Sequence, residues 1–129
     1  MKKNSYGLDF DKLQSMGHKG MSVLPVVIQD WQTLSVLLVG YVNALALEKT
    51  QETGLVTLWS TSRDCLWVKG QTSGDFLVLK EIRVNCEENS LLFLVAPQGH
   101  GCCHVKTGEG LPQKTCFFRR IEGDHLAFL

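Results

Sequence analysis

This chain contains five cysteines, and three of them, in separate segments, could together bind one metal ion. Cys86 follows a long apolar segment, Cys103 lies in a glycine-rich loop, and Cys116 begins the last apolar segment. Thiolates bind Zn²⁺ strongly, and a structural zinc site normally pairs its cysteines at C-x₂₋₄-C spacing. That spacing is absent among these three, so three thiolates with one open position would suit a catalytic zinc that carries water. The alternative is that each cysteine is a small buried apolar residue in a strand.

The polar side chains around Cys86 form a second candidate metal site. An extended backbone over 85–89 would turn Asn85, Glu87 and Asn89 to one face and Cys86 to the other. Oxygen ligands on the first face would suit a hard cation, while the sulfur would serve a soft one. The alternative, which we favour from these residues alone, is a polar turn between two strands.

Further polar residues could move protons or hold phosphates. His104 directly follows Cys103, where a neutral imidazole would be a proton shuttle; a solvated loop histidine is the alternative. The segments 59–63 and 66–74 combine hydroxyls, glycines, two cations and two tryptophans, which suit a phosphate cradle. An ordinary polar hairpin turn is the alternative. The GxxxxGK[ST] pattern is absent, so nucleotide hydrolysis of the P-loop kind is not expected.

Length, charge and hydropathy restrict the class of protein. A chain of 129 residues fits one domain, and 13 Lys and Arg balance 13 Asp and Glu. A neutral protein has no long-range attraction to nucleic acid or to an anionic membrane, so we expect neither partner. No apolar run reaches the roughly 18 residues that cross a bilayer. The first twenty residues lack the apolar core of a secretory signal, so we expect a reducing, cytoplasmic compartment.

The pattern of residues predicts an α+β fold, mainly antiparallel β with one clear helix. Asn43 as N-cap and Gly54 as a left-handed C′ residue bound a helix over 44–53, with Leu45 and Leu47 on its apolar side. Residues 1–20 are expected to be a loose lead-in to a single domain over 21–129. The expected strands are 23–28, 36–42, 55–60, 65–69, 76–85, 91–96 and 115–121.

Five of these strands carry a more specific expectation. The strands 23–28 and 36–42 should form a hairpin. Alternation along 76–85 predicts one apolar face for the whole strand, and the almost wholly apolar 91–96 should be central and buried on both faces. The strand 115–121 should close the sheet.

Taken in order, four segments resemble motifs of the phosphoribosyl-AMP cyclohydrolase family, the ring-opening enzymes of histidine biosynthesis. The family's W-S-x-S-R-x-x-L-W-x-K-G-x-T-S-G is similar to Trp59–Gly74, and its I-R-x-D-C-D-x-D-x-L-L to Ile82–Leu92. G-x-x-C-H-T-G is similar to Gly99–Gly108, and S-C-F-Y-R to Thr115–Arg119. With similar stretches upstream, the resemblance covers about residues 8–119.

This resemblance implies a homodimeric cyclic amidine hydrolase that adds water to the adenine ring of phosphoribosyl-AMP and opens the N1–C6 bond. It implies metal sites near the subunit interface, with His104 relaying protons. The zinc ligands would be Cys86, Cys103 and Cys116. The magnesium positions would be Asn85, Glu87 and Asn89. The weaker candidates for holding the phosphates and ribose would be Arg63, Lys69, Thr72 and Ser73.

The chain departs from the family motifs at several positions. The D-C-D-x-D motif has become N-C-E-E-N, which leaves Glu87 as the only charge on the oxygen face. Mg²⁺ prefers carboxylates in octahedral geometry, so we expect weak or absent magnesium binding until substrate phosphates arrive. Asp75 adds a negative charge near the expected phosphate. Cys102, beside Cys103, could compete for zinc or form a redox couple.

Two alternatives follow from these departures. Every zinc position is intact while every magnesium position has changed, so a diverged paralogue could keep zinc but be inactive or act on another nucleotide-like ligand. A non-enzymatic zinc protein or a thiol sensor using Cys102 and Cys103 is the other alternative. The H-x-E and P-C-x-x-C signature of the zinc nucleoside deaminases is absent, which excludes that class of hydrolase.

Overall fold

A computed structural model describes residues 22–129, so the lead-in expected over 1–20 lies outside the described residues. The chain divides into two compact units, a larger one of Val23–Cys116 and a second that contains Phe117–Leu129. All the predicted site residues belong to the larger unit. No helix within residues 22–129 is long and apolar enough to span a bilayer.

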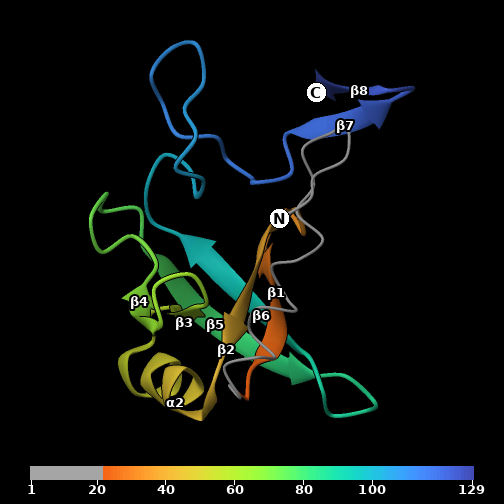
Figure 1. Cartoon of the computed structure of the whole chain (residues 1–129). Helices are drawn as coiled ribbons and strands as arrows, with labels where there is room; N and C mark the ends of the chain where they lie inside the picture. The colour runs from red at the N-terminus through yellow and green to blue at the C-terminus, as the bar shows by residue number, and fades with distance from the viewer. Residues whose placement is uncertain (1–21) are drawn as a thin grey trace. The chain divides into compact units, whose positions relative to one another are not determined.

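A four-stranded mixed sheet forms the centre of the larger unit (Figure 1). Its strands are β1 (Leu24–Asp30), β2 (Val36–Val42), β5 (Leu77–Val84) and β6 (Leu91–Pro97), in the order β2-β1-β6-β5. The β1–β2 hairpin is antiparallel, as predicted, and so is the β5–β6 pair. The central β1–β6 pair is parallel. With one helix in the described chain, the predicted α+β class is confirmed.

Helix α2 (Ala44–Thr53) has the predicted bounds because local capping groups fix both of its ends. The Asn43 side-chain oxygen accepts a hydrogen bond from the amide of Ala46 at 2.8 Å, and Gly54 ends the helix with a φ of 74°. The predicted placement of Leu45 on the apolar side is wrong, since its side chain is 44% exposed. Ala46 and Thr50, one turn apart, are the buried residues instead.

Helix α2 and the hairpin of β3 (Thr57–Ser60) and β4 (Cys65–Val68) lie along one side of the sheet (Figure 1). A β-carbon on Gly40 would lie 2.9 Å from Leu58 Cδ1, so a larger residue there would displace the buried Leu58 side chain. The core between these layers is built from fully buried apolar side chains, among them Val26, Ile28, Val56, Leu58, Phe93 and Val95.

Strand β5 contains a bulge that the alternation of its sequence did not reveal. The pairing with β6 shifts register between Leu79 and Glu81, which leaves Lys80 as an extra residue. Leu79 packs against the core before the bulge and Ile82 after it, because one inserted residue reverses the alternation of side chains. The single apolar face predicted for 76–85 is therefore wrong, and Val84 is 58% exposed.

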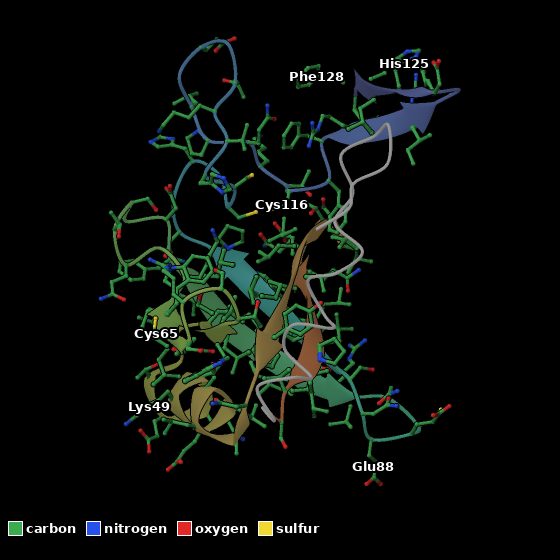
Figure 2. The ribbon with its side chains drawn as sticks, in the orientation of Figure 1. Lys49, Cys65, Glu88, Cys116, His125 and Phe128 are labelled. Atoms are coloured by element: carbon green, nitrogen blue, oxygen red, sulfur yellow. The ribbon has the colours of Figure 1, made fainter. Side chains whose placement is uncertain are left out.

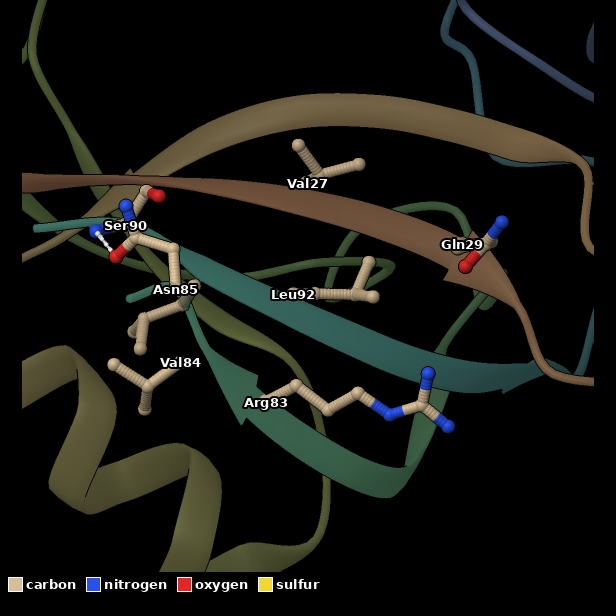
Figure 3. A pocket seen from close by; sticks show the side chains of 8 residues that line it. Val27, Gln29, Arg83, Val84, Asn85, Ser90 and Leu92 are labelled. Atoms are coloured by element: carbon tan, nitrogen blue, oxygen red, sulfur yellow. Dashed lines mark hydrogen bonds between the residues drawn. The ribbon is translucent and has the colours of Figure 1, made fainter. Parts of the chain in front are cut away.

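Strand β6 is central, as predicted, but its second face is only partly covered within the larger unit. Phe93 and Val95 are fully buried on the core face. On the opposite face, Leu92 lines an open groove of about 460 Å³ together with Val27 and Arg83 (Figure 3). The prediction of burial on both faces is therefore wrong along this part of the strand.

The C-terminal unit contains a hairpin of β7 (Arg119–Glu122) and β8 (His125–Phe128). These two strands make a separate two-stranded sheet, so the prediction that 115–121 closes the main sheet is wrong. Thr115 and Cys116 lie in the larger unit before β7, and they bond to β2 instead of extending a strand. The Thr115 hydroxyl donates to Val36 O at 2.7 Å, and the Cys116 amide donates to Leu37 O at 2.7 Å.

Candidate functional site

A cavity of about 330 Å³ brings together two segments of the larger unit that lie far apart in the sequence. The first segment follows the start of β4 and contributes Trp67, Lys69, Gly70, Thr72, Ser73 and Asp75. The second lies in the loop after β6 and contributes Cys102, Cys103, His104, Lys106 and Pro112. Five of the predicted site residues therefore share one cavity: Lys69, Thr72, Ser73, Cys103 and His104.

The first segment is folded into a tight loop by backbone contacts. The Gly74 amide donates to Gly70 O at 2.7 Å. Gly70 has a φ of +91°, and a β-carbon there would lie 2.5 Å from Phe76 N, so glycine is required both by conformation and by space. The loop thereby presents the exposed hydroxyls of Thr72 and Ser73 to the cavity.

The second segment is held by one carbonyl group. The amides of Cys102 and Cys103 both donate to Gln113 O at 3.1 Å. A β-carbon on Gly101 would lie 2.5 Å from Pro112 O, so the backbone at Gly101 is in contact with the backbone at Pro112. This contact fixes where the two cysteines emerge from the loop.

Cys116 joins this pair because it is anchored to the same region of β2. The Cys116 amide and the Cys102 thiol both donate to Leu37 O, at 2.7 and 3.5 Å. The Cys102 thiol also donates to Lys114 O at 3.1 Å. The Cys116 thiol lies close enough to those of Cys102 and Cys103 to affect their acidities. The structure therefore brings Cys103 and Cys116 together.

These contacts shift the acidities of the three thiols in different directions. The hydrogen bond with Cys116 lowers the pKa of Cys102, and the same bond raises the pKa of Cys116 well above the ordinary range. Burial raises the pKa of Cys103. A metal ion that binds Cys103 and Cys116 must therefore displace their protons.

Lys69 places a positive charge beside these sulfurs. Its side chain is buried, and its ammonium lies 5.1 Å from the centroid of the Trp67 ring, a cation–π distance. Its charge favours the thiolate forms of Cys102, Cys103 and Cys116. The cavity therefore has an electropositive wall next to its thiols.

Cys86 lies apart from the other predicted zinc residues. It is exposed in the loop between β5 and β6, whereas the loop that carries Cys103 leaves β6 at Pro97, its opposite end. A seven-residue strand spans about 20 Å. Figure 2 shows Cys116 near one end of the sheet and Glu88, which is two residues from Cys86, beyond the other end. Within residues 22–129, no three or more His, Cys, Asp or Glu side chains are grouped to hold a metal ion.

The segment 85–89 is a turn, so the extended arrangement is wrong and the polar-turn alternative is confirmed. Asn85 Oδ1 accepts hydrogen bonds from the amides of Asn89 at 2.9 Å and Ser90 at 3.0 Å (Figure 3). Asn85 Nδ2 donates to Asn89 Oδ1 at 2.7 Å. The two carboxamides hold the turn closed, and Glu87 is exposed beside them.

Arg63 does not line the cavity. It is exposed in the turn between β3 and β4, where its amide donates to Ser60 Oγ at 3.3 Å. Six lining residues were not predicted as site residues: Trp67, Gly70, Asp75, Cys102, Lys106 and Pro112. Trp67 lies within the W-x-K-G-x-T-S-G motif and Asp75 directly follows it, so the motif could have indicated both as site residues. Lys106 lies in a stretch that the family motif lacks, so the sequence gave no signal for it.

Replacing Gly101 tests the loop contact. We expect Gly101→Ala to lower the free energy of unfolding by about 1–3 kcal/mol, because its methyl group would overlap the carbonyl of Pro112. The loosened loop should also expose Cys103, so its alkylation by iodoacetamide in the folded protein should be faster. Gly108→Ala is the matched control in the same loop, since nothing lies within 4 Å of its added β-carbon. Equal stability and equal alkylation rates for the two variants would contradict this account.

Comparison with known proteins gives a consistent result. Residues 38–118 match the model of the family described as phosphoribosyl-AMP cyclohydrolase. The chain is 45% identical over 117 residues to the phosphoribosyl-AMP cyclohydrolase of Methanosarcina barkeri, covering 91% of this chain and 82% of the relative. It is 41% identical over 119 residues to that of Desulfatibacillum aliphaticivorans, covering 92% and 85%. It is also 45% identical over 101 residues to the histidine biosynthesis bifunctional protein HisIE of Buchnera aphidicola, covering 78% and 44%. The chain therefore belongs to the phosphoribosyl-AMP cyclohydrolase family.

Proposed function

We propose that this protein is a zinc-dependent phosphoribosyl-AMP cyclohydrolase that hydrolyses the N1–C6 bond of the adenine ring in histidine biosynthesis. The names of its relatives support the reaction and the pathway. The observation that carries the proposal is the cavity, where residues implied by the resemblance converge from two distant segments. A cation, two hydroxyls, a histidine and a thiol in one cavity suit a phosphorylated substrate and a hydrolytic reaction.

Binding is assigned to the first segment. The ammonium of Lys69 and the hydroxyls of Thr72 and Ser73 are donors for phosphate and ribose oxygens. Lys106, from the other segment, adds a second cation across the cavity. The carboxylate of Asp75 accepts a hydrogen bond from the His100 amide at 3.2 Å. This bond partly offsets the negative charge of Asp75 and so reduces its repulsion of a bound phosphate.

Proton transfer is assigned to His104. This residue lines the cavity, is exposed, and directly follows Cys103 in the chain. An imidazole can take a proton from an attacking water and return it to the nitrogen that leaves when the ring opens.

The donor chemistry of the thiols fits zinc, although one chain completes only part of the site. The Cys103 amide bonds to Gln113 O, three residues before Cys116 in the same segment, and soft thiolates select Zn²⁺ over hard cations. A bound zinc ion would supply Lewis acidity, lowering the pKa of a water at its open position. Cys86 is the third ligand in this proposal, and the length of β6 keeps it from reaching the pair in its own chain.

A second copy of the chain can supply Cys86, and we therefore propose a homodimer. Cys86 is exposed, as a residue that binds into a partner must be. The open groove on the sheet, lined by Val27 and Leu92, runs to Asn85, directly beside Cys86. A second copy covering this groove would bury apolar surface next to the shared metal site.

Magnesium has little support from the chain. Asn85 and Asn89 use their carboxamides to hold the turn, and an amide carries no charge with which to attract a cation. Magnesium binding in this proposal therefore waits for the phosphates of the substrate. The same feature keeps the diverged paralogue as the alternative: a protein that holds zinc but is inactive or acts on another nucleotide-like ligand. The five free cysteines support a reducing, cytoplasmic setting.

The activity is tested by loading the purified protein with zinc, adding phosphoribosyl-AMP, and following loss of the adenine ring by ultraviolet absorption. We expect turnover, and we expect His104→Ala to lower kcat by about 100-fold because proton transfer is lost. His100→Ala is the matched control, since His100 is exposed in the same loop and does not line the cavity. Zinc binding without turnover would contradict the proposed reaction and favour the diverged paralogue.

The metal response of the turn is tested by the double variant Asn85→Asp with Asn89→Asp. Two carboxylates would replace a 2.7 Å hydrogen bond, so the metal-free variant should lose about 1 kcal/mol of unfolding free energy. Mg²⁺ should bind the new carboxylates and raise the melting temperature of the variant, with no comparable rise in the unchanged protein. If magnesium shifts the melting temperatures of the variant and of the unchanged protein equally, the turn binds no cation.

A further inference from the structure

Cys102 is a third thiol near Cys103 and Cys116, and these three residues are called the sulfur cluster below. The zinc site proposed above does not use Cys102. It is buried, with 3% of its surface exposed, yet it lines the cavity. Its sulfur bonds to two carbonyl groups, Lys114 O and Leu37 O. Cys116 follows Lys114 by two residues, and its own amide bonds to Leu37 O. The sulfur of Cys102 is therefore packed against the backbone that carries Cys116.

From this geometry we propose that Cys102 and Cys116 form a reversible disulfide when the protein meets a peroxide. The Cys102 sulfur bonds to Leu37 O, the carbonyl that also binds the Cys116 amide, so the two residues lie side by side; both cysteines are free in the structure. Cys116 is exposed, so a small oxidant can reach its sulfur.

Neighbouring residues exclude the other simple pairing of Cys102. A disulfide joins residues whose Cα atoms lie about 4.4–6.8 Å apart. Adjacent residues joined by a trans peptide have Cα atoms about 3.8 Å apart, and no cis peptide occurs within residues 22–129. A bond between Cys102 and Cys103 would therefore be strained. Cys103 also accepts a hydrogen bond from the Val105 amide at 3.5 Å, which turns its sulfur toward its own loop.

The reaction balances in two steps. Hydrogen peroxide transfers one oxygen to one thiol of the pair, giving a sulfenic acid and one water as the O–O bond breaks. The other sulfur then attacks the sulfenic sulfur, forming the S–S bond and releasing the hydroxyl with the thiol proton as a second water. Two thiols are oxidised by two electrons, and one peroxide is reduced. A thiol reductant such as dithiothreitol reverses the step.

The consequence rests on the proposed function. Cys116 is one of the proposed zinc ligands, and a sulfur in a disulfide no longer binds zinc as a thiolate. Oxidation would therefore release the metal and stop hydrolysis until the disulfide is reduced. Cys102 makes the change reversible, because the disulfide with Cys116 forms before either sulfur is oxidised further.

The disulfide is tested on zinc-free, full-length protein treated with one equivalent of hydrogen peroxide, blocked with iodoacetamide, digested and sequenced by mass spectrometry. We expect a peptide pair linked through Cys102 and Cys116 that disappears after dithiothreitol. A link from Cys103 to Cys116, or irreversible oxidation of Cys116 in unlinked peptides, would overturn the proposal. This experiment uses the unchanged protein and needs no zinc, so its failure is distinguishable from failure of the proposed function.

The consequence is tested by peroxide-driven zinc release from the zinc-loaded protein, read with a chromogenic chelator. Zinc released from the unchanged protein should rebind after dithiothreitol, whereas zinc released from Cys102→Ser should not, because Cys116 would be overoxidised. Cys65→Ser is the matched control at an exposed cysteine of β4 and should behave as the unchanged protein. Cys102→Ala serves if the serine variant fails to fold, as judged by circular dichroism. Equal recovery of zinc in the Cys102 variant and the control would overturn the protective role.

Discussion

Two carbonyl groups hold together the part of this molecule that can do chemistry. Gln113 O binds the amides of Cys102 and Cys103, and Leu37 O binds the amide of Cys116. These bonds join the loop after β6 to the segment before Phe117, and join that segment to β2. Both carbonyls are backbone groups of the larger unit, so the sulfur cluster depends on the placement of the main chain before it depends on any side chain.

The sheet sets the complementary constraint. Strand β6 is central and its core face is closely packed, so the distance between its two ends cannot shorten. Cys86 emerges at one end and the loop with Cys103 at the other. The same rigidity that orders the cavity therefore keeps one chain from assembling three cysteines around a single ion. The metal site shared by two copies that we propose would reconcile the motifs of the family with the fold of one chain.

The helix and the site motifs were predictable because their signals are local in the sequence. The features that were predicted wrongly depend on contacts between residues far apart in the sequence. The ends of α2 were predictable because Asn43 and Gly54 act within one turn of themselves. The bulge at Lys80 was not, because it is defined by the pairing partner in β6. The motifs identified five cavity residues, and the polar turn at 85–89 was favoured from its residues alone, but the separation of Cys86 from Cys103 is not visible until β5 and β6 are paired. Asp75 and Lys106 complete the cavity only in three dimensions.

The shared site is tested most directly by mixing two variants that are each expected to be inactive, Cys86→Ser and Cys116→Ser. In a mixed dimer, the first chain provides Cys103 and Cys116 while the second provides Cys86, so one complete site forms. Unfolding and refolding an equal mixture should restore about a quarter of the zinc-dependent activity of the unchanged protein, because half of the dimers are mixed and each has one of two sites intact. Activity that stays at the level of the separate variants, or a Cys86→Ser protein that is fully active alone, would contradict the account.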